Sequence, residues 1–107
     1  YLFVNNSDDN NPVITRYDVG DNFSSELFFD GTELLKDYGG GFDGLKVHSS
    51  GNIFSTGPGG VLVISPDGEL ISGINFGGGV TNCNFDEDEQ FLYVTGFGFV
   101  ARVSLNW

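Results

Sequence analysis

The residues of this 107-residue chain that could do chemistry together are Asp43, Thr81 and Asn82. They combine a carboxylate with a hydroxyl and an amide at corresponding places of an internal repeat, in which residues 43–47 match residues 81–85. Such oxygens are the ligands that a hard cation such as calcium prefers, commonly about six to eight with waters included. A carboxylate gathered among them is costly without a cation, because desolvation disfavours its charge. The alternative is an Asx-type turn, in which Asp43 binds its own backbone, and both interpretations stay open.

The repeat predicts the fold class. Two further pairs of segments, 53–57 with 92–96 and 61–65 with 100–104, match at an offset of 39 residues, against 38 for the first pair. A third, looser copy lies near the N-terminus, at residues 2–6 and 14–18. A strand-rich period of roughly 40 residues is typical of a β-propeller, in which each repeat forms one four-stranded sheet, or blade. Equivalent positions of successive blades meet around one axis, so we expect Asp43 to lie beside Thr81 and Asn82.

The elements that must position these residues are short strands. Alternating apolar residues and glycine-rich turn signals predict an all-β chain of about ten strands. They are expected near residues 2–5, 13–19, 25–29, 44–48, 52–56, 60–64, 69–75, 82–85, 91–95 and 99–105. A helix-like stretch at residues 32–36 is too short to form a helix on its own.

These strands form one partial β-propeller domain, residues 1–107, an arc of about two and a half four-stranded blades. The expected blades cover residues 1–38, without the innermost strand, residues 42–76, and residues 80–107, without the outermost strand. A propeller closes with about four to eight blades, so the two end sheets would leave apolar faces bare. We expect other polypeptide to cover them, either the remainder of a longer chain or a partner chain.

Charge and cysteine usage exclude some functions. The net charge of −11 argues against nucleic acid or an anionic membrane as a partner, since both need basic surfaces, and no apolar run is long enough for membrane insertion. The acidic residues at 8–9 and 86–89 are expected at solvated loop tips. Cys83 is a single cysteine in an expected inner strand and is interpreted as a buried, inert thiol. The compartment stays open.

Two further features have simple structural interpretations. The glycine runs at residues 39–41 and 57–60 lead into strands and not into helices, so they are interpreted as turn glycines and not as a phosphate cradle. His48 has no second histidine or cysteine at ligand spacing and is interpreted as a surface turn residue.

A series of motifs resembles a known family. The motifs are, in order, Phe42-Asp43-Gly44-Leu45-Lys46-Val47, Gly51-Asn52-Ile53, Thr56-Gly57-Pro58-Gly59-Gly60-Val61, Ser65-Pro66-Asp67-Gly68, Thr81-Asn82 and Leu92-Tyr93-Val94-Thr95. This order closely resembles the regucalcin, gluconolactonase and luciferin-regenerating-enzyme family. The resemblance spans essentially the whole chain and places it at the C-terminal third of a six-bladed propeller.

The resemblance implies a calcium-dependent, lactonase-type hydrolase that opens sugar or related lactones, although zinc, manganese or magnesium can replace calcium. The family's metal is held by a Glu, an Asn and an Asp from different blades, and Asp43 matches that Asp. The resemblance thus makes Asp43 both metal ligand and catalytic base, and Thr81 and Asn82 substrate-binding residues. The Glu and Asn would lie upstream of Tyr1, so this chain alone is not expected to be competent. Two departures are Phe42 in place of the usual Pro, which is expected to alter the mouth of the pocket, and His48 in place of an Asp.

Two other functions remain possible at this point. One is a non-catalytic propeller subunit that acts as a scaffold or binding module. The other is a related esterase or phosphotriesterase, because such a metal centre suits several electrophiles. The expected partners are a small lactone and the polypeptide that completes the propeller.

Overall fold

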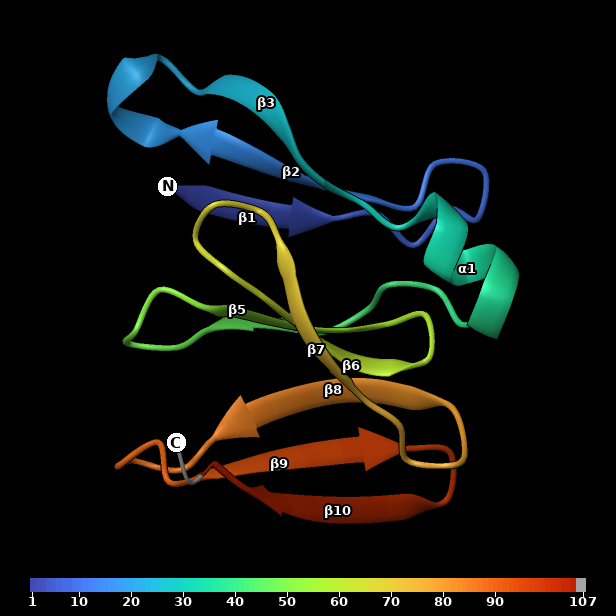
Figure 1. Cartoon of the computed structure of the whole chain (residues 1–107). Coiled ribbons are helices and arrows are strands. Elements are labelled where there is room, and N and C mark those ends of the chain that lie inside the picture. Colours follow the sequence, from blue (N-terminus) through green and yellow to red (C-terminus); the bar gives the residue numbers. More distant parts are fainter. Residues whose placement is uncertain (106–107) are drawn as a thin grey trace.

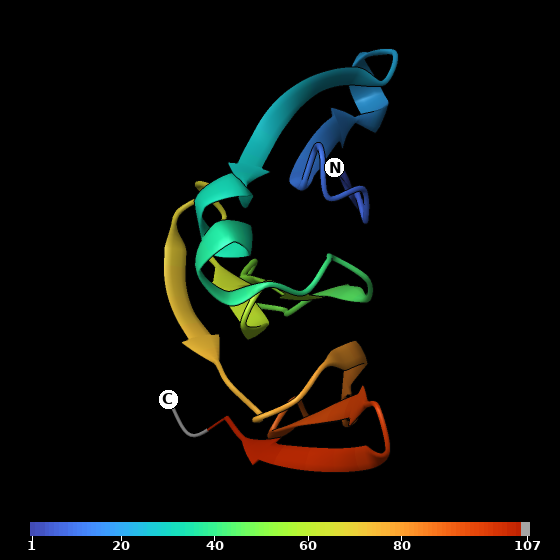
Figure 2. The same ribbon diagram turned by 90° about the vertical axis from the view of Figure 1, so that its right-hand side faces the viewer.

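The computed structural model describes residues 1–105, which form three antiparallel sheets side by side in an open arc (Figures 1 and 2). The strand orders are β1-β2-β3, β4-β5-β6-β7 and β10-β9-β8. The strands are β1 (Leu2–Asn5), β2 (Val13–Asp18), β3 (Ser24–Asp30), β4 (Leu45–Val47), β5 (Ile53–Gly57), β6 (Gly60–Ile64), β7 (Leu70–Ile74), β8 (Val80–Phe85), β9 (Phe91–Gly96) and β10 (Phe99–Ser104). A 3-10 turn, η1 (Val19–Asp21), and a helix, α1 (Thr32–Tyr38), complete the described elements.

The burial of the strands follows from their place in the arc. In β9, Leu92 and Val94 are buried while Tyr93 is exposed, the alternation of a strand with one covered face. All residues of β5 and β6 are buried, because the middle sheet has a neighbour on each side. The structure also has strands at the positions expected from the sequence, and the all-β class is confirmed.

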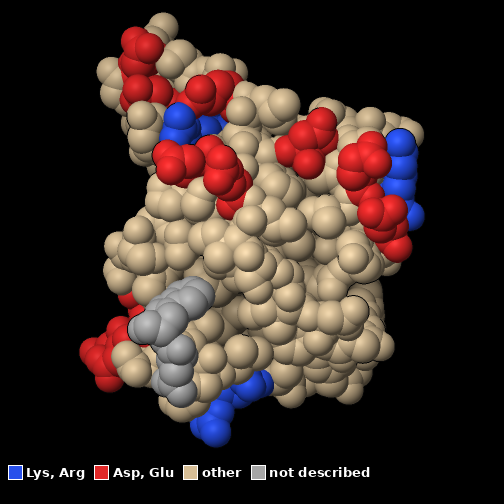
Figure 3. All heavy atoms as spheres, viewed as in Figure 1, with Lys and Arg blue, Asp and Glu red and all other residues tan. Residues whose placement is uncertain are grey.

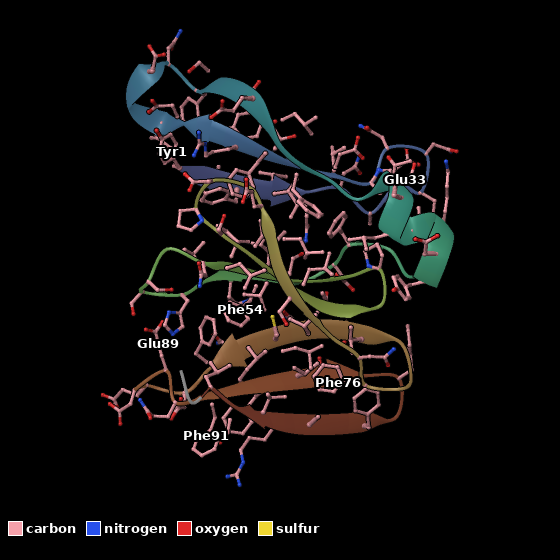
Figure 4. The ribbon with its side chains drawn as sticks, viewed as in Figure 1. Tyr1, Glu33, Phe54, Phe76, Glu89 and Phe91 are labelled. Atoms are coloured by element: carbon pink, nitrogen blue, oxygen red, sulfur yellow. The ribbon has the colours of Figure 1, made fainter. Side chains whose placement is uncertain are left out.

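Two apolar clusters join the three sheets. The first sheet meets the middle one through Ile14, Phe42, Ile53, Leu62 and Ile64. The middle sheet meets the third through Phe54, Val61, Val63, Cys83, Leu92, Val94 and Leu105 (Figure 4 shows Phe54 between them). Consecutive residues of β5 and β6 thus enter opposite clusters, and this packing fixes how the sheets sit relative to one another.

The helix α1 corrects one expectation, since the sequence stretch at 32–36 was considered too short. The structure has seven helical residues there. Asp30 accepts hydrogen bonds from the Thr32 N–H (3.0 Å) and hydroxyl (2.5 Å), while Leu34 packs against the first apolar cluster. Tertiary packing therefore stabilises a helix that local propensity would not.

The two end sheets turn apolar side chains away from the arc. In β1, Phe3 packs inward, so Leu2 and Val4 lie on the opposite face, where they are 49% and 46% exposed. On the outer face of the third sheet, Tyr93 and Val100 are 41% and 74% exposed. Bare apolar faces at both ends were expected, and the structure has them.

The charged surface is mainly acidic and peripheral. Figure 3 shows acidic side chains at the β2–β3 end of the first sheet and around α1, while the centre of that face carries no charged residue. Among residues 1–105, no helix is both long and apolar enough to cross a membrane.

Candidate active site: a glycine-lined cavity

A cavity of about 770 Å³ lies at one end of the sheets. This is the right-hand end in Figure 1 and the end that faces the viewer in Figure 2, where α1 and the β5–β6, β7–β8 and β9–β10 connections lie. More than half of the lining residues are glycines, from segments 39–41, 57–60 and 77–79. The two glycine runs interpreted as turns thus do lie in connections, and they also leave space for the cavity.

Asp43 is held at this cavity through its backbone. Its N–H donates to the Thr56 carbonyl (3.2 Å), and its carbonyl accepts from the Asn5 side-chain amide (2.9 Å). The next N–H, of Gly44, donates to the Thr81 carbonyl (3.0 Å) and to the Thr56 hydroxyl (2.9 Å). Asn5, Thr56 and Thr81 belong to the first, middle and third sheets, so all three sheets hold the Asp43-Gly44 peptide unit.

The Asp43 side chain is exposed and borders the cavity. Within residues 1–105, no N–H or O–H group donates a hydrogen bond to its carboxylate, so the Asx-type turn considered above does not form. Asp43 is also the single acidic residue among the described residues that line the cavity. An exposed acidic residue on an anchored backbone thus borders a space large enough for a small ligand.

Phe42, which directly precedes Asp43, anchors this loop in the core. It is 1% exposed and belongs to the first apolar cluster. Its ring packs against two glycines: a Cβ at Gly57 would lie 2.7 Å from Phe42 Cδ1, and one at Gly31 would lie 2.9 Å from Cε2. The residue that replaces the family's usual Pro is therefore a buried anchor of the loop, although it also borders the cavity.

Thr81 borders the same cavity, and it occupies a β-bulge. Val80 pairs with Gly96 and Asn82 with Thr95, so Thr81 is the extra residue in β8. Its hydroxyl lies 2.9 Å from the Thr95 hydroxyl and 3.2 Å from the Thr95 carbonyl. The hydroxyl is therefore engaged within its own sheet.

Asn82 lies next to Gly44 and is not among the residues that line the cavity. Its side-chain oxygen accepts a hydrogen bond from the Cys83 N–H (2.9 Å) and lies 3.4 Å from Lys46 Nζ. The expected neighbours Asp43 and Thr81 thus meet at the cavity, while Asn82 is exposed one residue further along the inner strand.

The described part of the chain contains no cluster of the acidic, histidine or cysteine side chains that commonly hold a metal. Among residues 1–105, no three His, Cys, Asp or Glu side chains are close enough together to hold a metal ion. Burial raises the pKa of the Cys83 thiol to about 11, which suits an inert core residue and agrees with its interpretation above. Among the described residues, Asp43 provides the one carboxylate at the cavity.

His48 corrects another expectation, because it is 9% exposed and not a surface residue. Its ring contacts Phe54 and Phe85, with centroids 6.0 and 5.2 Å away, and its Nε2 lies 3.7 Å from Glu89 Oε1. Glu89 also accepts a hydrogen bond from the Ser49 N–H (3.0 Å). This cluster lies at the opposite end of the sheets from the cavity (Glu89 is labelled in Figure 4) and joins the middle and third sheets.

Comparison with known proteins identifies the family. The model of the SMP-30/Gluconolactonase/LRE-like region matches residues 1–97. The chain belongs to this family. It is 35% identical, over 116 aligned positions, to a gluconolactonase of Zymomonas mobilis, an alignment that covers 95% of this chain and 31% of that protein. It also superimposes with a TM-score of 0.79 and 25% identity on the structure of a gluconolactonase from Xanthomonas campestris, with 98% of this chain and 34% of that one covered.

The chain thus spans about a third of the length of the relatives that it matches. The similarity to a gluconolactonase structure confirms the expected propeller fold and the expected family.

The sequence analysis did not identify several residues that line the cavity or that fix the Asp43-Gly44 peptide unit. Tyr38 and Phe97 line it, and Asn5 and Thr56 hold the Asp43-Gly44 unit by hydrogen bonds. One signal was available for Phe97, which lies between Gly96 and Gly98 and therefore at the tip of a tight turn. The role of Asn5 depends on contacts between sheets and leaves no local signal.

Proposed function

We propose that this chain supplies part of the active site of a metal-dependent hydrolase that opens sugar or related lactones. The observation that carries the proposal is that the exposed residue Asp43 borders a glycine-lined cavity on a peptide unit that three sheets hold in place. The relatives named as gluconolactonases support the lactone as the substrate class. The size of the cavity, about 770 Å³, is in the usual range for small-molecule sites.

The proposed cofactor is a divalent cation, with calcium as the first candidate, because Asp43 offers a hard oxygen ligand. Zinc, manganese and magnesium are the other candidates. The cation would polarise the lactone carbonyl and lower the pKa of a water molecule. Since Asp43 is the one carboxylate that the described residues provide at the cavity, any further carboxylate ligand is proposed to come from other polypeptide.

Asp43 has a second proposed role as general base. Its carboxylate accepts no hydrogen bond from the described residues, so its lone pairs are available to accept a proton from the attacking water. Thr81 borders the cavity and Asn82 is exposed beside Gly44, so both are proposed to bind the substrate. An amide can hydrogen-bond a substrate hydroxyl but cannot take a proton, so Asn82 is assigned to positioning and not to proton transfer.

We also propose that other polypeptide completes the ring, either further sequence of the same protein or a partner chain. Leu2 and Val4 at one end, and Tyr93 and Val100 at the other, form apolar faces that a neighbouring blade would bury. We call this chain together with the polypeptide that completes it the closed propeller.

The test is the Asp43→Asn substitution in the closed propeller. Lactone hydrolysis should be lost and divalent-cation binding weakened, because one side chain loses both its charge as ligand and its capacity to accept a proton. Unfolding by urea should be unchanged, since the Asp43 backbone and not its side chain makes the structural hydrogen bonds. Hydrolysis is followed by acid release, and cation binding by calorimetry.

Two variants serve as controls. Asp67→Asn changes an exposed carboxylate in the β6–β7 turn, outside the cavity, and should leave activity intact. Asn82→Ala should reduce activity more mildly than Asp43→Asn. Full activity of Asp43→Asn would refute the proposal, and hydrolysis of acyclic esters or phosphotriesters in preference to lactones would change the substrate class.

A further inference from the structure

The cavity that holds Asp43 also carries a large exposed aromatic side chain. Phe97 borders the cavity and is 79% exposed, the highest value among the large apolar residues of the described chain. The residue occupies the tip of the β9–β10 hairpin, where Gly96 pairs with Phe99 and leaves a two-residue turn. A phenyl ring at such a tip gains nothing from burial in its own chain, so its apolar surface is available for a ligand.

The Phe97 ring is anchored and not simply projecting into solvent. Its backbone N–H donates to the Gly79 carbonyl (3.1 Å), which ties the hairpin to the β7–β8 connection. One part of the ring lies against the same glycine: a Cβ at Gly79 would lie 2.6 Å from Phe97 Cδ2 and 2.7 Å from Cε2. Gly79 does not have a positive φ, so its backbone conformation does not require glycine, but the ring does.

Most of the other residues that line the cavity are glycines or polar residues, although Tyr38, Phe42 and Val80 also border it. Glycines make up more than half of the lining, and Ser7, Asn75 and Thr81 add polar groups. A ligand in this space therefore meets a flat, exposed apolar ring at Phe97, and hydrogen-bonding groups at Ser7, Asp43, Asn75 and Thr81. A ring-shaped molecule with one C–H face and several hydroxyl groups has the matching distribution of apolar and polar surface.

We propose that Phe97 is a specificity-determining residue that binds the C–H face of a cyclic ester and so favours sugar lactones over acyclic esters. This role rests on the proposed function of Asp43, because it assigns the substrate of the same cavity. Phe97 takes no part in proton transfer. Its contribution is to substrate binding and orientation.

The experiment compares Phe97→Ala, Phe97→Leu and Phe97→Tyr in the closed propeller, with a sugar lactone and an acyclic alkyl ester as substrates. Phe97→Ala should raise the KM for the lactone about tenfold, with kcat changed less than about threefold, because it removes one face of a phenyl contact. Phe97→Tyr keeps the flat ring and should retain the original KM within about threefold, whereas Phe97→Leu should behave like Phe97→Ala. The KM for the acyclic ester should change little.

Two further variants separate binding from structure. Val100→Ala is the matched control, because Val100 lies in the same hairpin but outside the cavity. Since Val100 belongs to the apolar face that the closed propeller is proposed to cover, this variant is expected to lower stability and to leave the KM unchanged. Gly79→Ala keeps the Phe97 ring but displaces it, so it should raise the KM for the lactone as Phe97→Ala does.

The outcomes distinguish this inference from the proposed function. If Asp43→Asn is inactive but Phe97→Ala and Phe97→Leu retain the original KM, the role of Phe97 is refuted and the ring is covered by polypeptide of the closed propeller. If Asp43→Asn is fully active, the proposed function itself fails. If Val100→Ala and Phe97→Ala raise the KM equally, the effect belongs to the hairpin and not to the ring.

Discussion

Replacing Gly57 by alanine tests how the cavity residue Asp43 is positioned. Gly57 ends β5 with an ordinary backbone conformation, so an alanine there is not strained by its φ angle. The added Cβ would, however, lie 2.7 Å from Phe42 Cδ1 and 2.9 Å from Cε1. Phe42 is almost completely buried and precedes Asp43 directly, so its ring has to move, and the Asp43 backbone moves with it.

The size of the effect follows from two opposing terms. Forcing one extra methyl group into a packed core costs about 1–3 kcal/mol, because side chains leave their preferred rotamers. A Gly→Ala change also stabilises a protein by about 0.4–1 kcal/mol through the lower entropy of the unfolded chain. We therefore expect Gly57→Ala to lower the free energy of unfolding by about 1–2 kcal/mol. Lactone hydrolysis should fall as well, because Asp43 shifts within the cavity.

Gly73→Ala is the matched control. Gly73 is also a strand glycine without a positive φ, but the nearest atom to its added Cβ would be Leu62 Cδ2 at 3.8 Å, an ordinary contact. Urea unfolding of the closed propeller should show this variant to be as stable as the original or slightly more stable, with activity unchanged. In a Phe42→Ala background, which itself costs about 3–5 kcal/mol, Gly57→Ala should cost no more than Gly73→Ala. Equal stability and activity of Gly57→Ala and Gly73→Ala in the original background would refute the reasoning.

Two other predictions concern groups outside the cavity. Hydrogen bonding from Ser49 and the nearby His48 lower the pKa of Glu89 below its ordinary value of 4.5, so its contribution to stability is present above that value and is lost as the pH falls through the lowered pKa. The free energy of unfolding, measured with urea at neutral pH, should therefore be smaller for Glu89→Gln than for the original protein. This difference should vanish in acid. A difference that does not change with pH would contradict the Glu89 interaction. Because burial raises the pKa of Cys83 to about 11, iodoacetamide at about pH 8 should leave it unmodified in the folded protein and alkylate it in urea, and rapid alkylation of the folded protein would contradict its burial.

The internal repeat predicted the strands well because the same pattern of alternating apolar residues occurs in each copy. Each copy needs apolar residues at alternate positions of strands that lie between neighbouring sheets. The structure places Gly44 beside Asn82 and bonds the Gly44 N–H to Thr81, as the alignment of residues 43–47 with 81–85 predicts. The helix α1 could not be predicted in the same way, since it depends on Leu34 packing against residues distant in sequence.

His48 shows why burial is harder to predict than secondary structure. The serine- and glycine-rich turn that follows it is typical of a surface, and the turn is at the surface. The imidazole is nevertheless covered by Phe54 and Phe85 and approached by Glu89, a residue more than one period away. A single sequence does not reveal which side chains of a neighbouring sheet will cover such a position.

The glycines around the cavity limit sequence-based prediction in a different way. At Gly59 and Gly98 a positive φ requires glycine, so turn chemistry explains them. At Gly57 and Gly79 the φ angle would allow any residue, and glycine is needed because an aromatic ring occupies the place of a side chain. Glycines required by a positive φ and glycines required by an adjacent ring cannot be told apart in the sequence. The difference matters for the candidate site, because Gly57 leaves room for the ring of Phe42, which precedes Asp43, and Gly79 leaves room for the ring of Phe97 at the same cavity. The proposed chemistry of Asp43 thus comes from its motif, whereas the surfaces that position it and its proposed substrate become visible only once the sheets are packed together.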